Sequence, residues 1–299
     1  MRDFLRKITP IFLLTAYRKN KKDQRNKALE KERQEGHVLT HDDLVQQFRA
    51  IGIQEGDVLL VHSSLSKIGY VEEGPKTVVE ALLEAVGAHG HLLMPNSPNP
   101  SLQLDYIRGL EIFDVANDAS KLGAISEYFR KLPQAVRSAH PTEPVSCIGK
   151  DALWFTQEHF GCLTPYTVKS PFYKVSERKG KILYLGVTLD NAGTNLHTLE
   201  DAVDTFPYPV YFEDIFTINV RFPDGKVEAM KTKVHNPVQS AKRKCDGLIP
   251  MFLENGVLQE VKIGHARALL VDAEGLLATM IQAFQERGVT MYTPEGVKA

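Results

Sequence analysis

Two short apolar runs joined by an amphipathic segment constrain the fold of this chain more than any other feature. Residues 58–61 read Val-Leu-Leu-Val, and residues 91–94 read His-Leu-Leu-Met before a proline. Between them, residues 75–86 carry apolar side chains at positions 78, 79, 82, 83 and 86, which share one face of a helix. This strand–helix–strand order predicts an α/β fold with a mainly parallel central sheet flanked by helices.

Later segments extend this pattern and add one exception. Thr40 with Asp43 forms a capping-box signature for a helix that ends near Gly52, residues 121–132 and 273–287 are expected helices, and residues 181–186 are an expected buried strand. Residues 205–235 differ, because alternating polar and apolar residues lead into the turn sequence Pro223-Asp224-Gly225. We expect an antiparallel β insertion there.

The first 38 residues differ from the rest in charge. Residues 1–34 hold eleven Lys and Arg against four acidic residues, a net of +7, which leaves 25 − 33 = −8 for the remainder. We therefore expect a basic amphipathic N-terminal segment, residues 1–38, and a single domain, residues 39–299. The segment fits a helix packed on the domain or on a second subunit of a homo-oligomer, followed by a solvated arm. Pro10 favours this interpretation, because it breaks any single long helix. The alternative is residues 1–35 resting on an anionic membrane surface.

Several classes of protein lack their sequence signatures here. No apolar run approaches the roughly 20 residues that span a bilayer, and no secretory cleavage pattern follows the charged N-terminus. Three scattered cysteines do not form a disulfide framework or a zinc motif, so we expect a cytoplasmic protein, placed at the inner face of the membrane if residues 1–35 bind it. HExxH and GxSxG are absent and no nucleic-acid module is recognisable, so we expect no metal and no nucleic-acid partner.

The loop after the first strand is a candidate phosphate or cofactor site. It runs His62-Ser63-Ser64-Leu65 and continues through Gly69 and Gly74 into the helix at 75. Ligands of open α/β sheets bind at the carboxyl ends of strands, where backbone N–H groups and hydroxyls hold phosphates. The alternative is a turn whose serines bind only their own backbone.

A second candidate is Arg137-Ser138-Ala139-His140-Pro141. An arginine, a serine and a histidine fixed by the following proline suit an anion such as a cofactor phosphate. An arginine that ties down a carboxylate, next to a loop histidine, explains the same residues equally well.

The third candidate follows the buried strand at 181–186. Thr194, His197 and Glu200 are spaced three apart, so they share one face if this stretch is helical. A neutral histidine beside a carboxylate is a general base with its orienting group. The alternative is a histidine satisfied within a helix cap.

Taken in order, these segments resemble the aminoglycoside 3-N-acetyltransferases, often called antibiotic N-acetyltransferases. The similarity covers about residues 39–275 and includes Val61-His62-Ser63-Ser64-Leu65, Arg137-Ser138-Ala139-His140-Pro141 and the stretch from Thr194 to Glu200. The resemblance implies acetyl transfer from acetyl-CoA to an amino group, with His197 as the base, Glu200 as its orienting group and Thr194 in the catalytic centre. It also implies a cofactor-binding set, namely His62, Ser63, Ser64, Leu65, Gly69, Gly74, Arg137, Ser138 and His140.

The chain departs from the family pattern at Glu73, at His91 and at Glu143-Pro144-Val145. Together with the basic N-terminal segment, these departures lead us to expect a small-molecule amino-sugar acceptor, linked to a nucleotide and used for cell-surface polysaccharide. Two alternatives stay open, an aminoglycoside-resistance acetyltransferase and a non-catalytic relative that binds CoA or a sugar.

Overall fold

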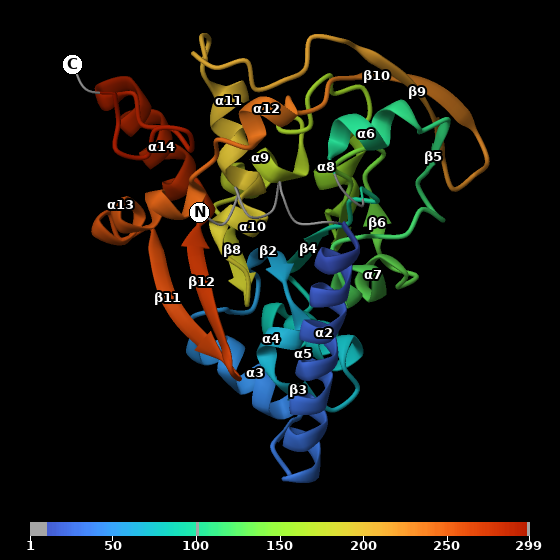
Figure 1. The fold of residues 1–299 in the computed structure, drawn as a ribbon, viewed down its shortest axis with the longest axis vertical. Helices are drawn as coiled ribbons and strands as arrows, with labels where there is room; N and C mark the ends of the chain where they lie inside the picture. The colour runs from blue at the N-terminus through green and yellow to red at the C-terminus, as the bar shows by residue number, and fades with distance from the viewer. Residues whose placement is uncertain (1–10, 100–101, 298–299) are drawn as a thin grey trace.

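The computed structural model describes residues 11–99 and 102–297 (Figure 1). The expectations for residues 1–10, including the apolar side chains of the N-terminal segment, lie outside the described residues. From Ile11 the chain forms one helix, α2 (Ile11–Gln34), whose last turns lie against the two-stranded sheet of β1 (Val38–Leu39) and β3 (Tyr70–Val71). Glu32 Oε2 accepts a hydrogen bond from Tyr70 N at 2.9 Å. None of the described helices is both long enough and apolar enough to cross a bilayer.

A seven-stranded sheet forms the centre of the domain. Its order is β11 (Leu258–Ile263), β12 (Ala266–Asp272), β8 (Lys181–Leu185), β2 (Val58–Ser63), β4 (His91–Pro95), β7 (Val145–Ile148) and β6 (Val136–Arg137). Only the β8–β2 and β2–β4 pairs are parallel, and the other four pairs are antiparallel. The expectation of a mainly parallel sheet is therefore wrong outside the three central strands. A short turn such as the one between β11 and β12 imposes antiparallel pairing, whereas a parallel pair needs a long crossover.

The central strands are buried on both faces, and their side chains alternate between two layers of helices. Leu59 and Val61 of β2 pack with α3 (His41–Ala50), α5 (Pro75–Val86) and α7 (Ala124–Arg130), whereas Leu60 packs with α9 (Pro171–Glu177) and α14 (Ala273–Arg287). The capping box of α3 is present as expected, because Thr40 accepts from Asp43 N and Asp43 accepts from Thr40 N. This two-sided burial accounts for the continuous apolar run at 58–61.

A separate three-stranded sheet confirms the antiparallel insertion. It contains β9 (Phe216–Arg221) and β10 (Val227–Thr232), which form a hairpin, and β5 (Ile112–Asp114), which pairs in parallel with β9. Between the sheets and around their edges lie short helices, namely α4 (Leu65–Ile68), α6 (Gln103–Arg108), α8 (Ala152–Thr156), α10 (Leu189–Ala192), α11 (Thr198–Ala202), α12 (Pro237–Ser240) and α13 (Ile249–Glu254). In Figure 1 the β9–β10 hairpin arches over the end of the molecule where α6, α11 and α12 gather.

Candidate active site

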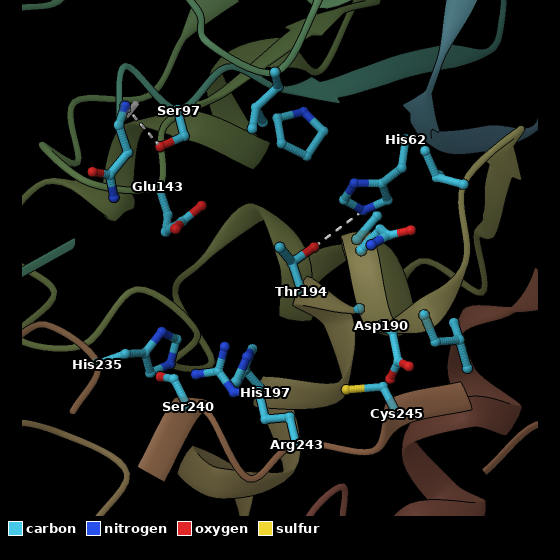
Figure 2. A pocket seen from close by; sticks show the side chains of 18 of the residues that line it. His62, Ser97, Glu143, Asp190, Thr194, His197, His235, Ser240, Arg243 and Cys245 are labelled. Atoms are coloured by element: carbon cyan, nitrogen blue, oxygen red, sulfur yellow. Dashed lines mark hydrogen bonds between the residues drawn. The ribbon is translucent and has the colours of Figure 1, made fainter. Parts of the chain in front are cut away.

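A cavity of about 390 Å³ opens beyond the carboxyl ends of the parallel strands. Val61, His62 and Ser63 from the end of β2 and Pro95 from the end of β4 form one wall. The loop from β8 to α11 and the segment from His235 to Cys245 form much of the rest (Figure 2). The site therefore lies where open α/β sheets bind ligands, although most strand pairs of this sheet are antiparallel.

His197 lies in the wall of this cavity and meets Glu200, as their spacing predicts. His197 ends the 3₁₀ turn of residues 194–197 and Glu200 lies in α11, and their side chains are almost fully buried. His197 Nδ1 lies 3.0 Å from Glu200 Oε1, although the direction departs from that of a hydrogen bond. Tyr292 donates its hydroxyl hydrogen bond to the same oxygen at 3.1 Å. With Nδ1 facing Glu200, Nε2 is the His197 nitrogen that can reach the cavity.

Burial decides the charge of His197. It holds the pKa of His197 well below the ordinary value, and the positive charge of Arg243 lowers it further. The imidazole is therefore neutral near pH 7 and can accept a proton. Glu200 supplies the negative charge that stabilises the imidazolium once it forms.

His235, which the sequence pattern does not single out, belongs to the same cluster. Its ring lies 4.2 Å from that of His197 between centroids, and Tyr166 stacks on both histidines. His235 Nε2 lies 3.8 Å from Glu200 Oε2, and burial followed by the neighbouring His197 lowers the pKa of His235 to about 3. It enters the site from the segment after β10, so no local spacing links it to His197.

The cluster is also where the described residues could hold a metal. One nitrogen of each histidine and a Glu200 oxygen lie within 4.8 Å of one another. Within the described part of the chain, His197 Nδ1, Glu200 Oε2 and His235 Nε2 have no hydrogen-bond partner. The guanidinium of Arg243, whose charge acts on both histidines, opposes a cation there.

Thr194 is in the cavity wall, and its hydroxyl pairs with His62 and not with His197. Its hydroxyl lies 3.0 Å from His62 Nε2 (Figure 2), and the His62 ring stacks on Tyr184 at 5.1 Å. Burial lowers the pKa of His62 to about 4, so this imidazole is neutral as well. The structure thus joins a residue of the first sequence segment to one of the third, because the parallel strands β2 and β8 are neighbours.

The remaining residues of the first loop are placed differently. Ser63 lines the cavity together with His62, whereas Ser64, Leu65, Gly69 and Gly74 follow the loop away from it into α4 and α5. Ser64 N donates to Leu185 O at 2.9 Å, which ties the end of β2 to the end of β8.

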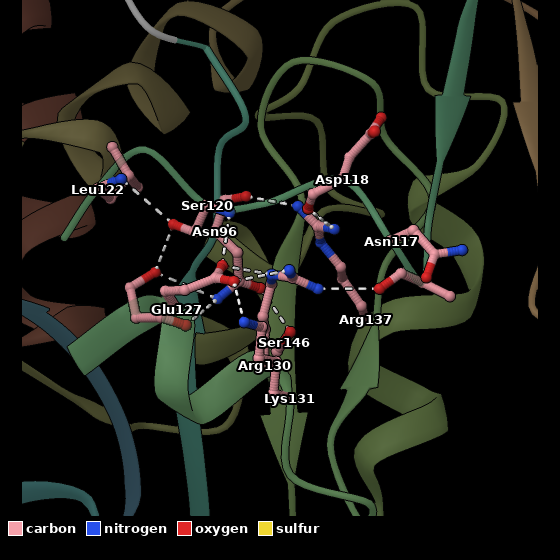
Figure 3. Close-up of polar contacts among 12 residues, drawn as sticks. Asn96, Asn117, Asp118, Ser120, Leu122, Glu127, Arg130, Lys131, Arg137 and Ser146 are labelled. Atoms are coloured by element: carbon pink, nitrogen blue, oxygen red, sulfur yellow. Dashed lines mark hydrogen bonds and ion pairs between the residues drawn. The ribbon is translucent and has the colours of Figure 1, made fainter. Parts of the chain in front are cut away.

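The structure does not bring Arg137, Ser138 or His140 to the cavity. The Arg137 guanidinium donates to the carbonyl oxygens of Asn96, Val115 and Asp118 at 2.6–3.0 Å (Figure 3). Ser138 Oγ lies 2.9 Å from His159 Nδ1, and the His140 ring stacks on that of His159. All three residues hold loops together, which favours the structural interpretation of this segment.

The chain matches known proteins over most of its length. The family model described as aminoglycoside 3-N-acetyltransferase matches residues 60–285. Aminoglycoside N(3)-acetyltransferase IV of Salmonella sp. is 32% identical over 257 residues, which are 85% of this chain and 91% of that protein.

Solved structures agree with this match. AAC-IIIb, solved as a binary complex with CoASH, has a TM-score of 0.70 at 26% identity and covers 83% of this chain and 97% of its own. A variant of AAC(3)-IVa in complex with a gentamicin has a TM-score of 0.67 at 28% identity, over 83% of this chain and 89% of its own. The expected enzyme class, an acyltransferase, is thereby confirmed, and the chain belongs to the aminoglycoside 3-N-acetyltransferase family.

Proposed function

We propose that this protein transfers the acetyl group of acetyl-CoA to the 3-amino group of an aminoglycoside, with His197 as general base. The observation that carries the proposal is a buried, neutral His197 beside Glu200 in the wall of a cavity, in a chain of this family. This pair counts against a non-catalytic relative, which would not need a buried carboxylate next to an uncharged histidine. The solved relative in complex with CoASH supports acetyl-CoA as the acetyl donor.

His197 performs the proton transfer that the reaction needs. Its Nε2 takes a proton from the acceptor amine as the amine nitrogen forms a bond to the thioester carbonyl carbon, and Glu200 stabilises the imidazolium. The carbon–sulfur bond then breaks, and His197 returns the proton to the CoA thiolate. Donors for the oxyanion are the hydroxyls of Ser63 and Thr194, and His62 orients Thr194 at 3.0 Å.

The donor would approach along the loop after β2. His62 and Ser63 are already in the cavity wall, and we infer that Ser64, Leu65, Gly69 and Gly74 border the path of the pantetheine and pyrophosphate. Arg137, Ser138 and His140 would support that loop region only indirectly, because their polar groups are used within the fold.

The comparisons support an aminoglycoside acceptor over the expected nucleotide-linked sugar. A relative was solved with a gentamicin, and the relatives compared above are aminoglycoside acetyltransferases. A role in polysaccharide synthesis is not supported by any of them.

Cytoplasmic location, homo-oligomer formation and membrane contact by residues 1–35 stay predictions. Binding of the protein to anionic vesicles, with and without residues 1–35, tests the last one.

Release of free CoA thiol tests the proposed function directly. Wild-type protein should acetylate gentamicin, sisomicin or apramycin faster than a nucleotide-linked 4-amino sugar. His197→Ala should lose about 100- to 10,000-fold in kcat, the usual contribution of a general base, while still binding acetyl-CoA by calorimetry. His89→Ala, at an exposed histidine outside the cavity, is the matched control. Near-normal turnover by His197→Ala would refute the assignment of the base.

A further inference from the structure

Glu143 is a carboxyl group in the cavity wall that the proposed chemistry does not use. The residue is 8% exposed, and Figure 2 shows its carboxyl group pointing into the space between Ser97 and His235. Gln103 Nε2 donates to Glu143 Oε1 at 2.5 Å. Among the described residues, Oε2 accepts no hydrogen bond and is not sealed from solvent, so it faces the cavity.

The backbone around Glu143 is held on both sides. Ser97 donates its hydroxyl to Thr142 O at 2.6 Å, and Asn96 N donates to Pro144 O at 2.8 Å. Gln103, which donates to the carboxyl group, also accepts a hydrogen bond from His235 N at 3.0 Å through its Oε1. The carboxyl group is therefore fixed in position, and Gln103 joins it to the backbone of His235, whose ring lies next to that of His197.

The carboxyl group of Glu143 has no cationic partner among the described side chains. In the described part of the chain no Lys, Arg or His nitrogen lies within 4.0 Å of it, and Arg243 acts on it only from farther away. Burial accordingly raises the pKa of Glu143 to about 7, against the weaker opposing effects of Gln103 and Arg243. Tyr166, the other titratable side chain that interacts with it, is neutral, because burial raises its pKa well above the ordinary value. A buried carboxylate without a partner is costly, and a cation from a ligand would remove that cost.

We propose that Glu143 binds a second ammonium group of the acceptor, distinct from the amine that is acetylated at His197. This inference rests on the proposed function and specifies it. The acceptor must carry at least two amino groups, one presented to His197 and one to Glu143 Oε2 across the same cavity. Gln103 holds the carboxylate in place, and the ammonium displaces the proton that about half of the free enzyme carries on Glu143 at pH 7.

Replacement of the carboxyl group tests the subsite. Glu143→Gln keeps a hydrogen-bond acceptor for Gln103 but removes the charge. We expect KM for a polyamine acceptor to rise about 10- to 100-fold with kcat much less affected, the effect of losing one charged hydrogen bond. Glu143→Asp should recover part of the affinity. Glu84→Gln removes one charge from the exposed surface of α5 and should leave KM unchanged. An acceptor analogue with the relevant amino group replaced by hydroxyl should bind wild type and Glu143→Gln equally.

Proton release gives a second readout that needs no change in turnover. Titration of wild type and Glu143→Gln with the aminoglycoside, in the presence of CoA and in buffers of different ionisation enthalpy, counts the protons set free on binding. At pH 7 wild type should release about half a proton more than the variant, because an ammonium group lowers the pKa of Glu143. Equal proton counts and equal KM values would overturn the subsite. Wild-type protein that acetylates no aminoglycoside would instead overturn the proposed function.

Discussion

At the scale of single residues, the site combines burial with one compensating charge. Burial keeps His197 neutral, which favours proton uptake but makes the imidazolium costly to form in a low-dielectric environment. Glu200, 6% exposed, supplies the opposite charge at 3.0 Å, and Tyr292 fixes its Oε1. Glu200 therefore supplies the charge that stabilises the His197 imidazolium, whereas Tyr292 holds Glu200 in position. Substitutions at the two residues can separate these effects.

Glu200→Gln removes the charge, whereas Tyr292→Phe removes only the orienting hydrogen bond. We expect kcat to fall about 100- to 10,000-fold in Glu200→Gln, because the imidazolium loses its stabilising partner. Tyr292→Phe should lose only about 2- to 10-fold, the effect of one hydrogen bond. Steady-state kinetics of CoA release with the same acceptor provides the measurement. Equal losses in the two variants would mean that orientation, and not charge, is what Glu200 contributes.

Local spacing predicts part of this site and cannot predict the rest. His197 and Glu200 are three residues apart, so the sequence indicates their contact directly. Thr194 shares that spacing, but its hydroxyl pairs with His62, 132 residues away, because β2 and β8 are neighbouring parallel strands. His235, Arg243 and Glu143 come from distant loops whose positions depend on the tertiary fold.

At the scale of elements, the sequence likewise predicts one part of the sheet and not the other. The apolar runs of β2, β4 and β8 are buried on both faces, and the sequence predicts these strands and their parallel orientation. β6, at one edge of the sheet, and its neighbour β7 have only two and four residues, and β11, at the other edge, is buried only at its two ends. Their antiparallel pairing depends on connections that the sequence pattern does not reveal.

The turn between α5 and β4 places the strand that borders the cavity, and Gly90 makes that turn possible. A Cβ at Gly90 would overlap the Val86 carbonyl oxygen and lie 2.9 Å from Asp57 O. We expect Gly90→Ala to lower the free energy of unfolding by about 2 kcal/mol or more, because backbone atoms must move. Gly109→Ala, where the nearest atom is 3.8 Å away, should change it by less than about 0.5 kcal/mol. Urea unfolding of both variants compares them, and equal stability would contradict the steric explanation.

At the scale of the whole molecule, the described chain buries six histidines that are at most 7% exposed. In five of them the pKa is lowered more than in His91, namely His62, His140, His159, His197 and His235. Burial is the main cause that lowers the pKa of each, to about 4 for His62, to about 3 for His159 and His235, and well below the ordinary value for the other two. Neutral imidazoles therefore lie in the core, at His140 and His159, as well as at the candidate active site.

These histidines should make the fold sensitive to acid. Their pKa values are lowered in the folded state, so below about pH 6.5 the unfolded chain binds more protons and stability falls as the pH is lowered. Glu143 and Asp201 act oppositely, because burial raises their pKa values to about 7 and about 6, and they offset two of the five histidines. Near pH 5 the net uptake on unfolding is about three protons, equivalent to roughly 4 kcal/mol per pH unit.

Thermal unfolding should therefore show a Tm that changes little above pH 7 and falls steeply between pH 6 and 5. A Tm that stays constant down to pH 5 would show that these histidines are not held neutral in the folded protein.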